Sequence, residues 1–207
     1  FGACQLEGWY GEATSWLLPA CQPVRNLELT VGVGVVSDDG DRTTEHVLQA
    51  KVLLRELTPG GVEVGLAGGI GFGPLAQALG DGATGVFAYV PLTASLGDDR
   101  LILHGNLGWR FERGARADER EALDGTRHVL TWATRADLLL PATRRRLQLI
   151  GELFGEDGLR PEYQIGVRSE VIQDRFHLDV SWGGHTAREE RGAGWAIGLA
   201  WTPPAFF

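Results

Sequence analysis

Charged and polar side chains recur at every second position of many segments of this chain, and they are the residues best suited to chemistry. The set predicted to share one inward face comprises Lys51, Arg55, His104, Asn106, Arg110, Arg135, Asp137, Glu152, Arg168, Glu170, His177 and Asp179. On the wall of a pore, such groups select permeating ions by charge. Packed against one another, they would instead form a salt-bridge network that fills a small barrel. The sequence leaves both interpretations open.

Opposite charges within this set are expected to approach one another on neighbouring strands. We predict that Arg110 lies near Arg135 and Asp137, and that Glu152 lies near Arg168. Further acids fall on the same faces, namely Glu7, Glu28, Glu63, Glu112, Glu156 and Glu162.

Three residues with the types of a catalytic triad share one face of a single predicted strand: His177, Asp179 and Ser181. A spacing of two residues along a strand separates side chains by roughly 6.5–7 Å, whereas a nucleophile and its base need about 2.6–3.2 Å. No metal-ligand spacing is present, and the glycine-rich segment 68–73 lacks the Lys-Ser/Thr of a phosphate loop. The sequence therefore predicts no catalytic residue, metal or cofactor, and it does not favour an enzyme.

The elements that must position these residues are short β-strands, because hydrophobic residues alternate with polar ones throughout the chain. Leu27, Leu29, Val31, Val33 and Val35, for example, alternate with glutamate, threonine and glycine. This pattern predicts ten strands between residues 26 and 203. Residues 3–12 and 14–22 are expected to add two more, although their alternation is poorer.

The connections between the predicted strands alternate in length. Short turns are expected at 22–25, 59–61, 97–99, 141–145 and 173–174, and longer polar loops at 37–46, 73–83, 113–126 and 185–193, with 157–160 a short exception. Short periplasmic turns and longer extracellular loops are typical of outer-membrane barrels. The sequence thus predicts an all-β fold in one domain, residues 1–207: a closed antiparallel transmembrane β-barrel of about twelve strands.

The apolar face of these strands could meet either a protein core or lipid. A soluble barrel or sandwich buries that face, whereas a membrane barrel turns it outward. Aromatic residues near the strand ends favour lipid, because tryptophan prefers membrane interfaces; the residues assigned to this role are Trp109, Trp132, Trp182, Trp195 and Trp201. The net charge of −8 argues against nucleic acid as a partner.

Two cysteines, Cys4 and Cys21, are the only ones in the chain. A hairpin centred between Glu12 and Ala13 would place them opposite each other on paired strands. The sequence therefore predicts a disulfide within an N-terminal hairpin, residues 3–22, and with it an oxidising compartment such as the periplasm.

Several short motifs resemble a known group of proteins. They are Gly2-Ala3-Cys4-Gln5-Leu6-Glu7, Leu18-Pro19-Ala20-Cys21, Asn26-Leu27-Glu28-Leu29 and Arg175-Phe176-His177-Leu178-Asp179. Together they resemble uncharacterised proteobacterial outer-membrane barrels, distantly similar to transporter-like channels of the phenol-degradation MetA type. The terminal Phe207 also resembles the signal read by the barrel-assembly machinery, although Pro203 and Pro204 interrupt the alternation before it. The resemblance implies an outer-membrane location and carries no catalytic residues.

Three functional hypotheses follow. The first is a passive outer-membrane channel or transporter for an unknown small solute, with a charged lumen. The second is an outer-membrane enzyme that acts on lipid or peptide at the barrel rim, where His185, Glu189 and Glu190 lie without an obvious nucleophile. The third is a structural barrel with a plugged lumen, whose loops 113–126 and 185–193 bind a partner. The partners expected in the first case are outer-membrane lipid and the assembly machinery.

Overall fold

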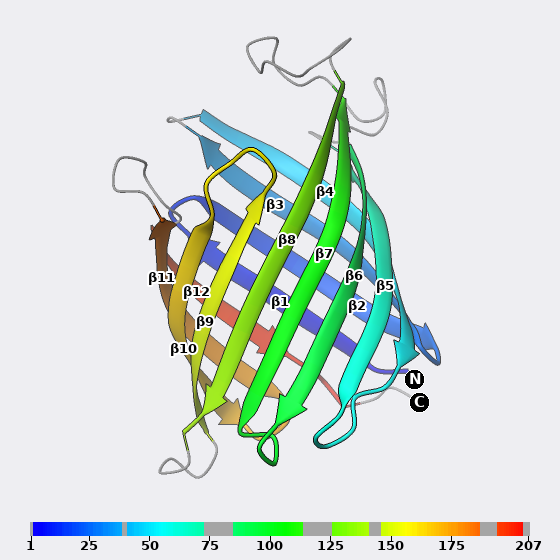
Figure 1. Cartoon of the computed structure of the whole chain (residues 1–207), viewed down its shortest axis with the longest axis vertical. Helices are drawn as coiled ribbons and strands as arrows, with labels where there is room; N and C mark the ends of the chain where they lie inside the picture. Colours follow the sequence, from blue (N-terminus) through cyan, green and yellow to red (C-terminus); the bar gives the residue numbers. More distant parts are fainter. Residues whose placement is uncertain are drawn as a thin grey trace.

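The protein is a closed β-barrel in a computed structural model that describes residues 2–38, 41–72, 85–113, 126–140, 146–186 and 194–204 (Figure 1). These residues form twelve strands. The strands are β1 (Cys4–Gly11), β2 (Thr14–Val24), β3 (Leu27–Asp38), β4 (Asp41–Arg55), β5 (Val62–Phe72), β6 (Gly85–Leu96), β7 (Leu101–Arg113), β8 (Thr126–Leu139), β9 (Leu147–Glu156), β10 (Glu162–Ile172), β11 (Phe176–His185) and β12 (Gly194–Trp201).

Each strand pairs with the strands before and after it in the chain, always antiparallel, and β1 pairs with β12 to close the sheet. The closing seam runs from the pair Leu6 and Trp201 to the pair Gly11 and Ala196. A closed sheet has no free edge, so its backbone N–H and C=O groups are satisfied internally. The predicted barrel of about twelve strands is therefore confirmed. The described residues contain no helix that is long and apolar enough to cross a membrane.

The outer surface of the barrel is apolar. Strand β3 illustrates the pattern, because Leu29, Val31, Val33 and Val35 all point outward and are 37–55% exposed. A sheet alternates its side chains between two faces, so the intervening residues of β3 point into the barrel. Leucine, valine and isoleucine side chains are exposed on nearly every strand. An apolar surface this large is not found in contact with water on soluble monomers. These side chains form instead the outward apolar band of a transmembrane barrel.

An aromatic band runs around the outside near one end of the barrel. Tyr10 on β1 contacts Trp195 on β12, whose Cα partner on β11 is Trp182, and Trp182 in turn contacts Tyr163 on β10. Farther around, Trp109 stacks on Phe111 and His128, and Trp132 is the Cα partner of Leu107. Trp201 lies at the opposite end, paired with Phe176. All five tryptophans assigned to the lipid interface thus share the outward face.

The turns at the end of the barrel that holds both chain termini are short (Figure 1). They use residues that accept a left-handed backbone: Asn26, Asp98, Asp99 and Asp174 all have positive φ values, between 56° and 65°. Asparagine and aspartate tolerate this conformation better than most residues, which explains why they stand between these hydrophobic strands.

The expected loop at 37–46 is wrong. Strands β3 and β4 continue through Ser37 paired with Arg42 and Asp38 paired with Asp41, so only residues 39–40 separate them. The polar residues Arg42, Thr43 and Thr44 suggested a loop, but they belong to β4 and pair with Ser37, Val36 and Val35 of β3. The other expected loops at 73–83, 113–126 and 185–193, the turn at 141–145, Glu189, Glu190 and Phe207 lie wholly or mostly outside the described residues.

The two cysteines form the predicted disulfide. Cys4 of β1 is the Cα partner of Cys21 of β2, with a Cα–Cα distance of 4.0 Å. The bond thus ties together the first hairpin, one strand of which forms the closing seam with β12. Its presence agrees with an oxidising compartment.

The lipid-facing assignment can be tested with arginine. Val180 is 58% exposed at the middle of β11, and Leu159 is 60% exposed in the turn between β9 and β10. In hydrocarbon, Val180→Arg should lower the free energy of unfolding by about 2–4 kcal/mol, because arginine at mid-bilayer is costly. In water, an exposed position would change by only about 0.5 kcal/mol. Urea unfolding in liposomes measures both values, with Leu159→Arg as the control; equal, small effects would refute the assignment.

Candidate functional site: the charged interior of the barrel

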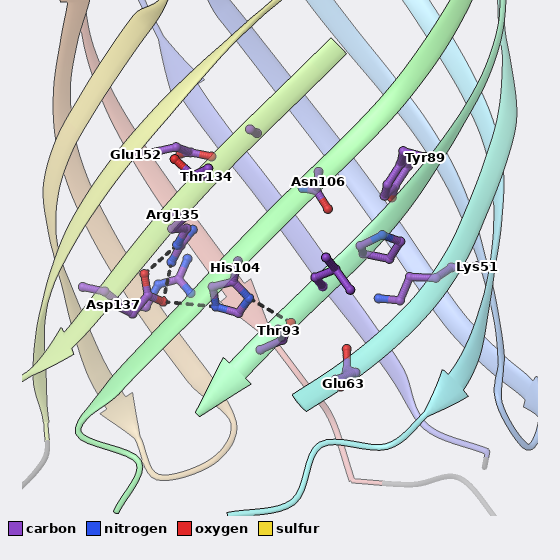
Figure 2. A pocket seen from close by; sticks show the side chains of 14 residues that line it. Lys51, Glu63, Tyr89, Thr93, His104, Asn106, Thr134, Arg135, Asp137 and Glu152 are labelled. Carbon is purple, nitrogen blue, oxygen red and sulfur yellow. Dashed lines mark hydrogen bonds and ion pairs between the residues drawn. The ribbon is translucent and has the colours of Figure 1, made fainter. Parts of the chain in front are cut away.

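A polar cavity of about 360 Å³ lies inside the barrel toward the end that holds the termini (Figure 2). Its lining comes from seven consecutive strands, β4 to β10, whose inward faces converge on it. Among the residues predicted for the interior, Lys51, His104, Asn106, Arg135, Asp137, Glu152 and Arg168 line this cavity. Glu63, Tyr89 and Thr93 complete much of its wall. The inward polar residues of many strands, which alternate with apolar ones in the sequence, therefore surround one cavity.

At the centre of this lining, the carboxylate of Asp137 interacts with side chains from two strands. Asp137 is 8% exposed and accepts two hydrogen bonds from the Arg135 guanidinium, at 2.6 and 2.9 Å. His104 Nε2 lies 3.9 Å from the same carboxylate, while its Nδ1 lies 3.1 Å from the Thr93 hydroxyl. Such a chain fixes the side chains of β6, β7 and β8 relative to one another (Figure 2). A bidentate arginine–carboxylate pair is a rigid, directional contact.

Two further ion pairs brace the wall on either side. Arg168 on β10 donates two hydrogen bonds to one oxygen of Asp179 on β11, at 2.8 and 3.1 Å. Across the barrel, Lys51 Nζ lies 3.5 Å from Glu28 Oε1. Glu152 feels the charges of both Arg135 and Arg168, which agrees with the expected proximity of Glu152 and Arg168.

A second cavity of about 620 Å³ lies farther along β7 to β11, toward the opposite end. Here Arg110 reaches Glu112 and Glu156, both at 2.6 Å, and Arg127 also binds Glu156, at 3.1 Å. The prediction that Arg110 lies near Arg135 and Asp137 is therefore wrong. The register pairs Arg110 with Val129 and places Arg135 opposite His104, and that stagger between strands cannot be read from alternation.

The remaining predicted residues lie near the end that holds the termini. Glu170 accepts a hydrogen bond from the backbone N–H of Asp174 in the turn, and its Cα partner on β11 is His177. The prediction that Arg55 faces inward is wrong. A bulge between Leu53 and Arg55 shifts the pairing, so Arg55 stands opposite Val64 rather than an inward residue. A bulge reverses the side-chain alternation beyond it.

An aromatic wall on β1 and β2 was missed by the sequence analysis. Trp9 pairs with Trp16 across the hairpin, with ring centroids 6.4 Å apart, and Trp16 pairs with Gly34 of β3. A side chain at Gly34 would collide with the Trp16 ring, since an added Cβ would lie 2.3 Å from it. Trp9 pairs with Gly198, which also neighbours inward-facing Asp179. Both indoles therefore lie inside the barrel.

Several polar side chains on the inward face are partly exposed. His104 and Arg110 are each 37% exposed at their side chains although both point into a closed barrel, and Asn106 on the strand face between them is exposed. A barrel filled by its own side chains would leave such groups buried, because protein interiors pack to high density. Within the described residues, these inward side chains are therefore not packed to the density of a protein core.

The residues that resembled a triad serve other contacts. Asp179 is engaged by Arg168, and Ser181 accepts a hydrogen bond from Gln164 Nε2. The part of the chain that the structure describes contains no group of three His, Cys, Asp or Glu residues arranged to hold a metal ion.

Comparison with known proteins places this barrel in a family. Residues 1–199 match the family model described as "Uncharacterised conserved protein UCP029691". The chain belongs to this family. No curated protein matches the sequence. Membership accounts for nearly the whole chain, so the barrel described above is the fold of the family's matched region.

The most informative similar structures are porins. KdgM porin superposes with a TM-score of 0.64 at 11% identity, covering 96% of this chain and 98% of KdgM. A structure of KdgM porin in complex with disordered oligogalacturonate gives 0.65 at the same identity and coverage. NanC porin gives 0.61 at 9% identity, again covering 96% and 98%. These likenesses show that this chain has the barrel fold of these porins. They provide no support for the resemblance to the MetA type.

The ion pair of Arg135 and Asp137 has a measurable role in stability. Asp137→Asn would leave a largely buried guanidinium without its counter-charge, and we expect a loss of about 3 kcal/mol in the free energy of unfolding. The matched control is Glu56→Gln, which breaks the exposed pair with Arg25 at 3.3 Å and should cost less than about 1 kcal/mol. Urea titration followed by tryptophan fluorescence measures both. Equal losses would show that Asp137 lies in bulk water.

Proposed function

We propose that this protein is a water-filled channel of a bacterial outer membrane that passes small hydrophilic molecules. The observation that carries the proposal is the contrast between the two faces of one closed sheet. The outer face is apolar, with an aromatic band, while the inner face holds charged side chains that remain partly exposed. A hydrated lumen inside a lipid-embedded wall would satisfy both faces, and this contrast supports the channel.

Location and partners follow from the same contrast. Outer-membrane lipid would cover the apolar band, and the Cys4–Cys21 disulfide agrees with export to an oxidising compartment. The barrel-assembly machinery would recognise the C-terminal segment that ends in Phe207. The names of KdgM and NanC as porins support a channel. The oligogalacturonate bound to KdgM supports the idea that a barrel of this size admits a hydrophilic chain molecule.

Planar-bilayer recording tests the channel directly. The purified full chain, reconstituted in neutral lipid, should produce discrete current steps, since a continuous aqueous path conducts ions. A heat-denatured sample of the same preparation is the control. An intact barrel that never conducts would reject the channel in favour of a plugged structural barrel.

Thiol accessibility tests the path without relying on conductance. Both native cysteines are in the disulfide, so one introduced cysteine is the only free thiol. Asn106→Cys faces the cavity, whereas the next residue, Leu107→Cys, faces outward and is 58% exposed. A membrane-impermeant thiol reagent should label Asn106→Cys rapidly and Leu107→Cys slowly, because lipid excludes both the reagent and the reactive thiolate. Equal labelling of the two would contradict the water-filled lumen.

A further inference from the structure

The charges on the interior wall do not balance. Every lysine and arginine on the inward faces of the described strands has a carboxylate within ion-pair distance: Lys51 pairs with Glu28, Arg110 with Glu112 and Glu156, Arg127 with Glu156, Arg135 with Asp137, and Arg168 with Asp179. The pairs neutralise the cations locally, and none of these basic groups is left over to attract an anion.

A set of carboxylates remains after this pairing. Among the residues that the structure describes, Glu7, Glu45, Glu63, Glu152, Glu162 and Glu170 face inward without an ion pair of 4.0 Å or less. They come from five different strands and extend from the mouth at Glu63 and Glu170 to the opposite cavity at Glu162. This distribution creates a negative potential along the lumen rather than one acidic cluster.

Aromatic side chains accompany these carboxylates. Trp9 is 37% exposed and stands on the same face of β1 as Glu7, two residues away. Tyr89 and Glu63 both line the cavity of about 360 Å³ near the end that holds the termini. The Tyr89 ring also stacks on Phe87, with 6.3 Å between ring centroids. The faces of tryptophan and tyrosine rings attract cations, and the attraction is strongest for weakly hydrated organic ammonium groups.

From these observations we infer that the lumen selects small organic cations, such as amines and quaternary ammonium compounds, over anions. The inference rests on the proposed channel. Unpaired carboxylates along the path lower the energy of any cation and raise that of any anion, and the exposed aromatic rings add a preference for cations with apolar substituents. The paired arginines hold the wall in shape without contributing a net positive charge.

The first arm of the test measures charge selectivity by reversal potential in a KCl gradient at low ionic strength. The wild-type channel should favour K⁺ over Cl⁻. A unit charge about 4 Å from an ion in water changes the local ion concentration about fivefold, so Glu63→Gln and Glu7→Gln should each lower the K⁺/Cl⁻ permeability ratio by up to about that factor. Glu56→Gln, which removes an exposed carboxylate of a turn, should leave the ratio unchanged.

The second arm replaces K⁺ on one side with choline as the organic probe. Trp9→Leu should reduce the choline/K⁺ permeability ratio by about twofold to fivefold while leaving K⁺/Cl⁻ unchanged. Trp201→Leu, which alters an outward tryptophan, is the matched control. Heat-modifiable migration in gels confirms that each variant is folded.

The outcomes separate the two proposals. A conducting channel that favours Cl⁻, or that does not discriminate, overturns the cation inference and leaves the channel standing. A choline ratio unaffected by Trp9→Leu overturns the preference for organic cations. Folded protein that never conducts overturns the channel and the inference together.

Discussion

The structure depends on one constraint: in hydrocarbon, each backbone N–H and C=O must find its partner within the protein. A sheet meets this requirement only by closing, and closure here is the pairing of β1 with β12 from Leu6 to Gly11. The disulfide lies on β1 and β2, beside that seam. Closure also divides each strand into a face toward lipid and a face toward the lumen, and the chemistry of the molecule follows from that division.

Packing inside the barrel relies on pairing large residues with glycine. Trp16 lies over Gly34 and Phe87 over Gly69, where an added Cβ would lie less than 3.0 Å from the ring, and at Gly108 an added Cβ would lie 2.8 Å from the Cβ of Tyr89. The rings are therefore laid along the wall by their neighbours and do not project freely across the lumen. A twelve-stranded barrel is intermediate between filled and open barrels, and this arrangement keeps the rings close to the wall.

Alternation of hydrophobic residues, together with the alternating lengths of the connections, was enough to predict the strand number and the closed antiparallel sheet, because a strand reports its two faces directly in sequence. The disulfide followed from the symmetry of one hairpin about Glu12 and Ala13. Alternation was insufficient for features that depend on neighbouring strands or on a bulge. Arg42 to Thr44 are polar on both faces, yet they continue β4 because their backbones pair with Ser37, Val36 and Val35 of β3. Arg55 follows a bulge that reverses its face. The contacts of Arg110 depend on the stagger of β7 against β9, which no single strand reveals.

The missed aromatic wall shows how two weak signals could have been combined. Alternation is poor in residues 3–22 because the inward face of that hairpin is itself hydrophobic, with Trp16 and Leu18 on β2. The register that pairs Cys4 with Cys21 also pairs Trp9 with Trp16 on the opposite face of the sheet. Gly32 and Gly34, inward on the next strand, leave the space that those side chains occupy. Glu7, which pairs with Leu18, shares this inward face with the two indoles, so the face mixes a carboxylate with large apolar side chains and alternation alone could not assign it.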